Sequence, residues 1–408
     1  MNEFKSVAAC NSDERLTHRE LPIYKTDGDV RSDFDRDYTR ILHSFGFRRL
    51  KHKTQVFFGG AGNDHICTRM EHVTHVGSVA FTLAEALGLN LELVKAIALG
   101  HDLGHAPFGH HGETVLNSIT KKYLNESFWH ERNGLHFIDD IELLPDHHEC
   151  MQNLNLTYAV RDGILSHCGE IDESSLKPRT VLIDLNDFNK PGQYQACTWE
   201  GCVVKLSDKI AYLGRDIEDA TILGYFSDKQ KAELRDMSAS FGNGESINTT
   251  SIIHNLIFDI CHNSSPDKGL CFSPDVYELL CKIKSFNNIN IYQSPRLETY
   301  RRYAELIINE LFRVLMEYYK GSDTVHLMAE RRFDGFGFVR EFAEWVTMYC
   351  DGGIGSESLL KMPYSNLLNK KIYGALDTPE LYTRAVVDYI SGMTDLYAQK
   401  SFEELLKC

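Results

Sequence analysis

The most informative stretch of the chain is HDLGHAPFGHHGE, residues 101–113. It opens on the adjacent pair His101-Asp102, with a further histidine, His72, upstream and a further carboxylate, Asp208, downstream. Imidazole and carboxylate groups bind divalent manganese, magnesium, iron, zinc or nickel, and the residue types alone do not choose among these ions. The set His72, His101, Asp102 and Asp208 therefore predicts one divalent metal site with four protein ligands.

Hydrophobic periodicity predicts that these ligands lie on the buried faces of three helices, over residues 71–88, 91–103 and 203–220. Each ligand stands four residues from an apolar position of its helix: His72 from Val76, His101 from Ile97, and Asp208 from Val204. A buried charge is costly unless it is paired or binds a metal. Three such positions together favour a metal site over three separate core residues.

The same periodicity over most of the chain predicts a mainly α fold, a helical bundle with additional C-terminal helices and at most a short β-hairpin near residues 56–67. Further helical patterns cover residues 31–56, 251–261, 295–319, 338–349 and 379–406, whereas 168–198 has the composition of a loop. We expect three parts: an N-terminal arm (1–30), a core (31–224) and a helical C-terminal region (225–408) packed on the core.

Composition narrows the class of protein. The net charge of −15 argues against binding to nucleic acid or to an anionic membrane. No stretch approaches the roughly 18 apolar residues of a membrane span, and the N-terminus lacks the apolar segment of a signal peptide. The 11 cysteines are scattered without a Cys-x-x-Cys pair, as in reduced proteins. We therefore expect a cytoplasmic protein with no membrane association.

Several groups near the metal ligands suit hydrolysis of a phosphate ester, which needs an activated water, charge neutralisation and a proton for the leaving oxygen. His105, His110 and Glu113 follow the His-Asp pair, and His130 comes later. A histidine suits proton transfer near neutral pH, and a carboxylate can orient it. By contrast, we expect His111, His147 and His148 on the surface.

On the third helix, Asp208, Tyr212 and Asp216 are spaced i, i+4 and i+8 and form one stripe. A tyrosine and a carboxylate beside a metal-bound phosphate suit hydrogen bonding to a sugar hydroxyl. A solvated helical face has the same spacing, so the pattern alone leaves both interpretations open.

The ordered set of ligands resembles the HD metal-dependent phosphohydrolase superfamily. Residues 47–56, FRRLKHKTQV, are similar to the FRRL-x-x-KTQV segment of its deoxyguanosine triphosphate triphosphohydrolase family. Other stretches that resemble this family are TRMEH (68–72), HDLGHAPFGH (101–110), LNLT (154–157), SDKIAY (207–212), DIEDA (216–220) and DYISGMTD (388–395). The resemblance covers roughly residues 31–400, and it makes the expected core an HD domain.

The resemblance implies hydrolysis of deoxynucleoside triphosphates, with a possible preference for dGTP, to a deoxynucleoside and triphosphate. It assigns metal binding to His72, His101, Asp102 and Asp208, and catalysis to His105, His110, Glu113 and His130. It assigns phosphate contacts to Arg69 and Lys209, nucleoside contacts to Gln55 and Tyr212, and a 3′-hydroxyl contact to Asp216. It also implies a homo-oligomer and a nucleotide activator.

Two positions depart from the common family pattern. Ala106 stands where a proline is usual, and FWHERN (128–133) is closer to the W-x-H-E form of the animal relatives than to the usual FEHN. Two other interpretations stay open: another HD phosphohydrolase, such as a 5′-nucleotidase or a cyclic-nucleotide phosphodiesterase, and a nucleotide-sensing module with little activity.

Overall fold

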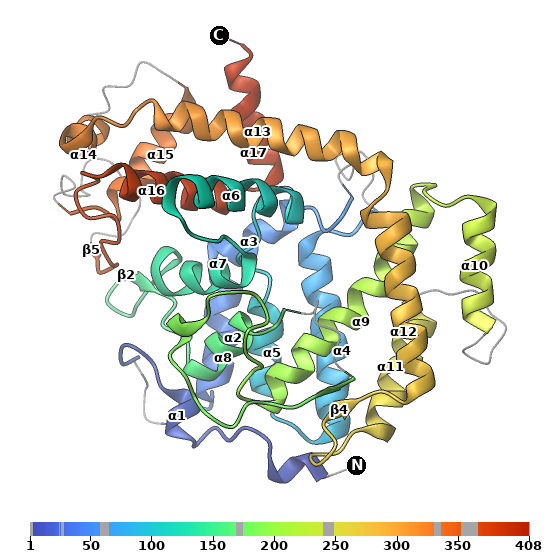
Figure 1. The fold of residues 1–408 in the computed structure, drawn as a ribbon. Coiled ribbons are helices and arrows are strands. Elements are labelled where there is room, and N and C mark those ends of the chain that lie inside the picture. The colour runs from blue at the N-terminus through green and yellow to red at the C-terminus, as the bar shows by residue number, and fades with distance from the viewer. Residues whose placement is uncertain are drawn as a thin grey trace.

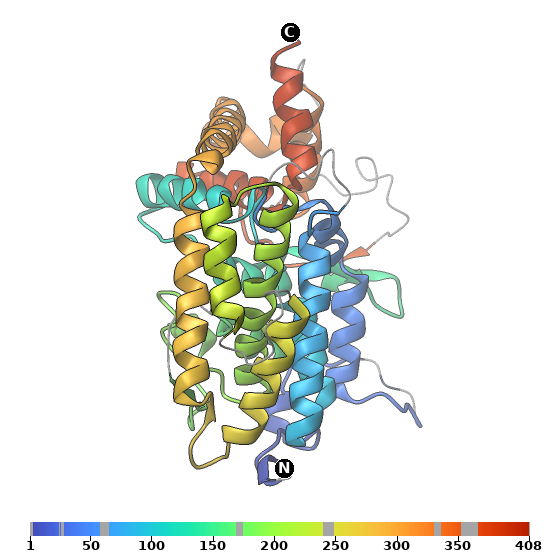
Figure 2. The same cartoon turned by 90° about the vertical axis from the view of Figure 1, so that its right-hand side faces the viewer.

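The computed structural model describes residues 3–23, 25, 28–57, 65–168, 174–239, 249–329, 336–351 and 366–407. The fold is mainly helical, as the sequence predicts, and its helices form two groups that cross at a steep angle (Figures 1 and 2). The turn of the expected hairpin near residues 56–67 falls outside the described residues.

The first group, here called the lower bundle, has helices α4, α10 and α12 upright in Figures 1 and 2, and α9 slants between them in Figure 1. Its members are α1 (Glu14–Thr17), α2 (Asp33–His43), α3 (Phe45–Arg49), α4 (Arg69–Leu87), α5 (Leu91–Gly100), α7 (His130–His136), α8 (Tyr158–Leu165), α9 (Trp199–Ile222), α10 (Asp228–Ala239), α11 (Thr249–Asn263) and α12 (Pro274–Asn287). The central helix α4 packs against α5, α9 and α11.

The second group, the upper layer, lies at the top in Figure 1, where α6, α13 and α16 run across the view and α17 stands upright. Its members are α6 (Gly109–Leu124), α13 (Glu298–Met316), α14 (Thr324–Ala329), α15 (Gly337–Thr347), α16 (Pro379–Gly392) and α17 (Asp395–Leu405). Helices α6, α13 and α16 pack on one another.

Each group has its own hydrophobic core, and the chain crosses between them in the segment 101–108. Leu103 belongs to the core of the lower bundle, whereas Ala106 and Phe108 belong to the core of the upper layer. The stretch that opens on His101-Asp102 therefore lies at the seam between two cores.

Local sequence explains where the central helices begin and end. Thr68 and Glu71 form a capping box at the start of α4, and Gly88, with φ of 79°, ends that helix as the sequence predicts. Asn90 then caps α5 by accepting hydrogen bonds from the backbone of Glu92 and Leu93. The two helices are thus fixed as an antiparallel pair with little freedom in their connection.

The strands are short and lie at the edge of the helical groups. Strand β1 (Leu143–Pro145) pairs antiparallel with β2 (Cys150–Asn153), which pairs parallel with β5 (Asn366–Leu367). Strands β3 (Ser175–Leu176) and β4 (Leu270–Cys271) form a second antiparallel pair. The hairpin of β1 and β2 lies outside the segment for which a hairpin was expected.

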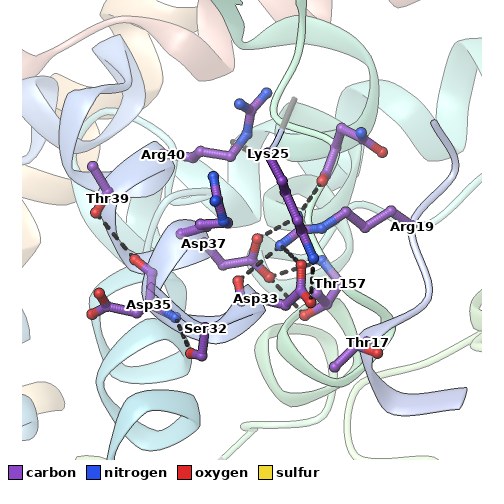
Figure 3. Close-up of polar contacts among 12 residues, drawn as sticks. Thr17, Arg19, Lys25, Ser32, Asp33, Asp35, Asp37, Thr39, Arg40 and Thr157 are labelled. Carbon is purple, nitrogen blue, oxygen red and sulfur yellow. Dashed lines mark hydrogen bonds and ion pairs between the residues drawn. The ribbon is translucent and has the colours of Figure 1, made fainter. Parts of the chain in front are cut away.

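The segment before α2 is attached to the lower bundle by a buried polar network (Figure 3). Arg19 forms an ion pair of 2.5 Å with Asp37 and donates to the carbonyl of Asn155, while Thr157 donates to the other Asp37 oxygen. Lys25 reaches Asp33 at 2.8 Å. A buried carboxylate with this many partners stabilises the junction of α2 and α8. The division into arm, core and C-terminal region remains a prediction.

Candidate metal centre and active site

Three helices of the lower bundle bring the expected metal ligands together. His72 lies on α4, His101 directly follows α5, and Asp208 lies on α9; one ligand atom from each falls within 4.8 Å of the others. His72 Nε2 is 2.9 Å from Asp208 Oδ1, and Asp102 Oδ1 is 3.5 Å from His101 Nε2. The convergence expected from helix phase is present, and the cluster could hold a metal ion.

His101 shows the protonation that a metal ligand needs. Its Nδ1 lies 2.7 Å from the carbonyl oxygen of Ala98, so this nitrogen carries the proton and Nε2 keeps its lone pair. Burial lowers the pKa of His101 to about 4, so the ring is neutral near pH 7. Its Nε2 is buried without a hydrogen-bond partner among the described residues. An orphaned acceptor facing His72 and Asp208 fits a bound cation.

Arg69, at the first position of α4, holds Asp102 in place. Its side chain is buried and donates from Nη1 to Asp102 Oδ2 at 2.7 Å, and from Nη2 to the carbonyl of Gln55 at 3.3 Å. The guanidinium thus pairs with the carboxylate that also faces His101. This positive charge beside the ligand cluster also suits contact with an anionic group.

The expected proton-transfer residues form a second cluster next to the ligands. His105, His110, Glu113 and His130 offer ligand or proton-transfer atoms within 4.8 Å of one another. His130 Nδ1 lies 3.0 Å from Glu113 Oε2, and His110 Nδ1 lies 3.4 Å from the same oxygen. His105 Nε2 is 3.1 Å from Asp102 Oδ1 and so links this cluster to the ligands.

The two stacked histidine rings of this cluster have pKa values shifted in opposite directions. His105 and His130 stack with centroids 3.9 Å apart. Burial, then the charge of Arg69, keeps the pKa of His105 well below its usual value. Burial also opposes charge on His130, but Glu131 and Glu113 outweigh it and raise its pKa to about 10. At neutral pH, His105 is neutral and His130 is a cation.

Gly104 allows this stacking because it lets two backbones touch. A Cβ atom at this position would lie 2.1 Å from the backbone oxygen of His130 and 2.1 Å from the backbone nitrogen of Gly134. Only glycine fits there, so the segment 101–108 can pack directly on α7.

The expected sugar-binding stripe lies on α9 in the same cavity. Tyr212 and Asp216 both line the cavity with Asp208. Asp216 accepts a hydrogen bond of 2.5 Å from the hydroxyl of Tyr292, which follows α12. Burial raises the pKa of Asp216 to about 7. The interpretation of this stripe as a solvated helical face is therefore wrong for Asp216.

These side chains surround a cavity of about 710 Å³, a size typical of small-molecule sites. The residues expected in the site that line it are Gln55, Arg69, His72, Asp102, His105, His110, Glu113, His130, Asp208, Tyr212 and Asp216. His101 is fully buried behind the wall. Lys209 is buried on α9 and does not line the cavity, because the residue next to Asp208 is rotated about 100° around the helix. Its phosphate contact stays a prediction.

The cavity also has lining residues that the sequence did not indicate. His111 was expected on the surface and instead lines the cavity, where burial lowers its pKa to about 4. His147 and His148 are exposed, as expected. Glu131, His167 and the α12 residues Lys284 and Ser285 also line the cavity. Helical periodicity in 274–287 could have located α12, but no local signal placed it over the site.

The C-terminal helices fix the segment that crosses the seam. Asp395 accepts hydrogen bonds from the backbone N–H groups of Phe108 at 2.8 Å and Thr54 at 2.9 Å. The buried ammonium of Lys53 donates to the carbonyls of His105 and Ser391. The upper layer therefore holds the backbone at Thr54 and along residues 105–108 in place.

No helix in the described residues is long and apolar enough to cross a membrane.

Comparison with known families agrees with this geometry. Residues 69–213 match the HD domain, and residues 359–404 match the phosphohydrolase-associated domain. The first match runs from Arg69 to just beyond Tyr212, so it includes all four expected metal ligands. The second contains Ser391 and Asp395, which contact the crossing segment.

Three relatives share one description, deoxyguanosinetriphosphate triphosphohydrolase-like protein. The relative from Caldanaerobacter subterraneus subsp. tengcongensis is 34% identical over 92% of this chain and 86% of its own length. The relative from Clostridium perfringens strain SM101 is 32% identical over 92% of this chain and 87% of its own. One from Desulfatibacillum aliphaticivorans is 36% identical over 69% and 73%. The chain therefore belongs to the family of deoxyguanosinetriphosphate triphosphohydrolase-like proteins and is an HD-domain, metal-dependent phosphohydrolase.

Proposed function

We propose that this chain hydrolyses deoxynucleoside triphosphates to a deoxynucleoside and inorganic triphosphate. The observation that carries the proposal is the stripe on α9: Asp208 belongs to the ligand cluster, while Tyr212 and Asp216 line the same cavity one and two turns along. A phosphate at the ligand cluster would thus have its sugar next to a tyrosine and a carboxylate.

His72, His101, Asp102 and Asp208 would hold one divalent ion. When bound, such an ion neutralises phosphate charge and lowers the pKa of a water molecule. Arg69 adds positive charge from the side of Asp102. The donor set does not choose among manganese, magnesium, iron, zinc and nickel.

The cluster of His105, His110, Glu113 and His130 would supply the proton that the leaving group needs. Water attacks the α-phosphorus, the bond from phosphorus to the 5′ oxygen breaks, and that oxygen takes a proton. His130 is charged at neutral pH and directs Nδ1 at Glu113, which leaves the proton on Nε2 to be donated. Glu113 keeps the ring oriented, and His110 contacts the same carboxylate.

Deoxyribose selectivity would come from α9. One oxygen of Asp216 accepts from Tyr292, and the other can accept from a 3′-hydroxyl. Tyr212, packed beneath the sugar, would exclude a 2′-hydroxyl. The names of the relatives make dGTP the first substrate to test. The homo-oligomer and the nucleotide activator remain predictions of the resemblance.

The test is a product analysis. The purified chain is incubated with each dNTP and NTP in Mn²⁺ or Mg²⁺, and the products are resolved by anion-exchange chromatography. We expect deoxynucleoside and triphosphate in equal amounts from dNTPs, with little turnover of NTPs. Release of a monophosphate with pyrophosphate, or of phosphate alone, would contradict the proposal.

A further inference from the structure

A second cavity, of about 430 Å³, lies where α15, α16 and α17 meet α3 and the helical turn after α7. That volume is within the range of small-molecule sites. The lining residues that carry rings or charges include Arg49, Phe137, Glu341, Trp345, Tyr389 and Tyr397. None of its lining residues lines the cavity at the ligand cluster, so the proposed reaction gives it no role.

Three partly exposed aromatic side chains, one from each of α15, α16 and α17, form much of the wall: Trp345, Tyr389 and Tyr397. The ring centroids of Trp345 and Tyr389 are 5.4 Å apart, and the hydroxyl oxygens of Tyr389 and Tyr397 are 2.8 Å apart. The face of an aromatic ring carries negative charge density and attracts cations. The wall therefore offers several electron-rich surfaces to one small ligand.

Glu341 adds a full negative charge to this wall. It lies one turn before Trp345 on α15, and its side chain is exposed. Its Oε2 accepts a hydrogen bond of 2.5 Å from the hydroxyl of Tyr397. Among the described residues, no lysine, arginine or histidine forms an ion pair with it. The carboxylate is therefore available to a cation from solution.

The other charged lining residues are already neutralised. Arg49 forms an ion pair with Glu142, and its guanidinium lies over the ring of Phe137, 5.7 Å from the centroid. Asp388 lies 2.9 Å from His136, whose pKa is raised to about 10 by Asp388 and Asp140 against the opposing effect of burial. The net charge of the lining is therefore negative, and the glutamate carries it.

The two tyrosines keep their protons at physiological pH. Burial, then the hydrogen bond to Glu341, raises the pKa of Tyr397, and burial also holds the pKa of Tyr389 well above its usual value. A phenol that donates to a carboxylate has a more electron-rich ring, which strengthens its attraction for a cation. In the described chain, no lysine or arginine lies over the rings of Trp345, Tyr389 or Tyr397.

We propose that this cavity binds a small alkylated ammonium ion, with its alkyl groups against the three rings and its charge beside Glu341. A divalent metal ion would need about six oxygen ligands, which one free carboxylate does not supply. A neutral apolar ligand would leave the carboxylate unused. An ion that is both apolar on its surface and positively charged uses both features of the wall.

The experiment titrates the full chain with choline chloride, exchanged for sodium chloride at constant ionic strength. Tryptophan fluorescence reports binding, because Trp345 lines the cavity, whereas Trp129 and Trp199 are 7% exposed and do not. We expect saturable binding with a Kd on the order of 1 mM, as suits so few non-hydrogen atoms. The uncharged carbon isostere dimethylbutanol should bind at least about 10-fold more weakly, because it has the shape without the charge.

Two variants localise the ligand, and saturation-transfer NMR of choline gives a readout that does not depend on tryptophan. Glu341→Gln removes the charge at nearly constant volume and should weaken binding about 10-fold. Trp345→Leu removes one ring and should abolish both signals. Glu344→Gln is the matched control, because Glu344 lies on the same helix but does not line the cavity; it should bind choline as the wild type does. Circular dichroism verifies folding.

The comparison of choline with dimethylbutanol uses the wild-type chain, so it decides the question even if a variant fails to fold. Equal affinity for the two molecules would overturn the proposal, because the cavity would then select for shape alone. Absence of saturable binding up to tens of millimolar choline would also overturn it. So would a folded Glu341→Gln chain with unchanged affinity. The proposal does not rest on the proposed function, and none of these results depends on turnover.

Discussion

Asp395, in the first turn of α17, accepts a 2.8 Å hydrogen bond from the backbone N–H of Phe108, a residue 287 positions earlier in the chain. Phe108 has φ of 65°, a left-handed conformation that costs a non-glycine residue about 1–2 kcal/mol. The same carboxylate also accepts from Thr54. One C-terminal side chain thus holds the strained end of the segment that carries His101 and His105.

Replacing Asp395 should therefore loosen the site from a distance. Asp395→Ala removes two buried acceptors, and we expect a loss of about 2–4 kcal/mol in the free energy of unfolding, measured with urea. Asp395→Asn keeps one acceptor oxygen, so its free energy of unfolding should lie between those of the wild type and Asp395→Ala. Equal stability of all three proteins would show that the contact does not hold the segment.

Gly104 should tolerate no side chain. Gly104→Ala places Cβ against two backbone atoms, so α7 must move, and we expect destabilisation of more than about 3 kcal/mol with loss of activity. Gly77→Ala on α4 is the matched control. Its Cβ meets nothing within 4 Å, and the change should stabilise the helix by about 0.5–1 kcal/mol. Similar unfolding curves for the two variants would disprove the close approach.

Two carboxylate variants should distinguish a loss of metal binding from a loss of proton transfer. Asp208→Asn removes a ligand, so both bound metal and turnover should be lost. Glu113→Gln leaves the ligand cluster intact but weakens the orientation of His130, so metal should remain while the rate falls about 10²- to 10⁴-fold. Metal content by mass spectrometry and steady-state kinetics measure the two effects. A Glu113→Gln enzyme with full rate would remove this residue from the mechanism.

Asp216 should accept a hydrogen bond from the 3′-hydroxyl of the substrate. Asp216→Asn should lower kcat/KM for a dNTP about 10- to 100-fold above pH 7, where the carboxylate is ionised, since a hydrogen bond to a charged group is worth about 1.5–3 kcal/mol. The matching 2′,3′-dideoxynucleotide lacks that hydroxyl, so its kcat/KM should be low for both proteins and nearly unchanged by the substitution. An equal drop for both substrates would indicate a general structural defect.

His136 should make stability depend on pH. It lies between Asp388 on α16 and Asp140, at 2.9 Å from each, and Tyr373 and Lys370 contact these two carboxylates. Burial opposes its charge, but Asp388 and Asp140 outweigh it and raise its pKa to about 10. Because the pKa is higher in the folded state, the stabilisation is fully present below about pH 6.5 and is lost as the pH rises through 10.

Urea unfolding of wild type and His136→Gln measures this effect. We expect the free energy of unfolding of the wild type to exceed that of His136→Gln by about 1–3 kcal/mol near pH 6, and this difference to shrink toward pH 10. Asp388→Asn should weaken the pH dependence of the wild type, because it removes the largest stabilising charge. A constant difference between pH 6 and 10 would mean that His136 contributes through packing alone.

The sequence predicted the parts of the fold that depend on local periodicity. Helices α4, α5 and α9 were expected within a few residues, because their apolar stripes and caps agree. The expected helix over residues 379–406 is divided at Met393, since Thr394 caps a new helix by accepting from the backbone of Tyr397. Helix α6 is not among the expected helices, because Gly109, Gly112 and the nearby Pro107 interrupt the helical pattern at its start.

The site was predictable where one helix carries several of its residues, and not where distant segments meet. The i, i+4 and i+8 spacing alone predicts that Asp208, Tyr212 and Asp216 share one face of α9, and all three line the cavity. Tyr292 reaches the cavity from another helix 76 residues beyond Asp216, and Glu131 and His167 meet only through tertiary packing. No local pattern encodes such contacts.

The seam between the two hydrophobic cores has a mechanical consequence. The expected metal ligands belong to the lower bundle, whereas His110 and Glu113 lie on α6 of the upper layer. A displacement of about 1 Å between the two layers would be enough to lower the rate by about 100-fold. The hydrogen bonds that Asp395 and Lys53 make across the seam therefore act as alignment pins, which hold the proton-transfer groups of one layer in register with the ligand cluster of the other.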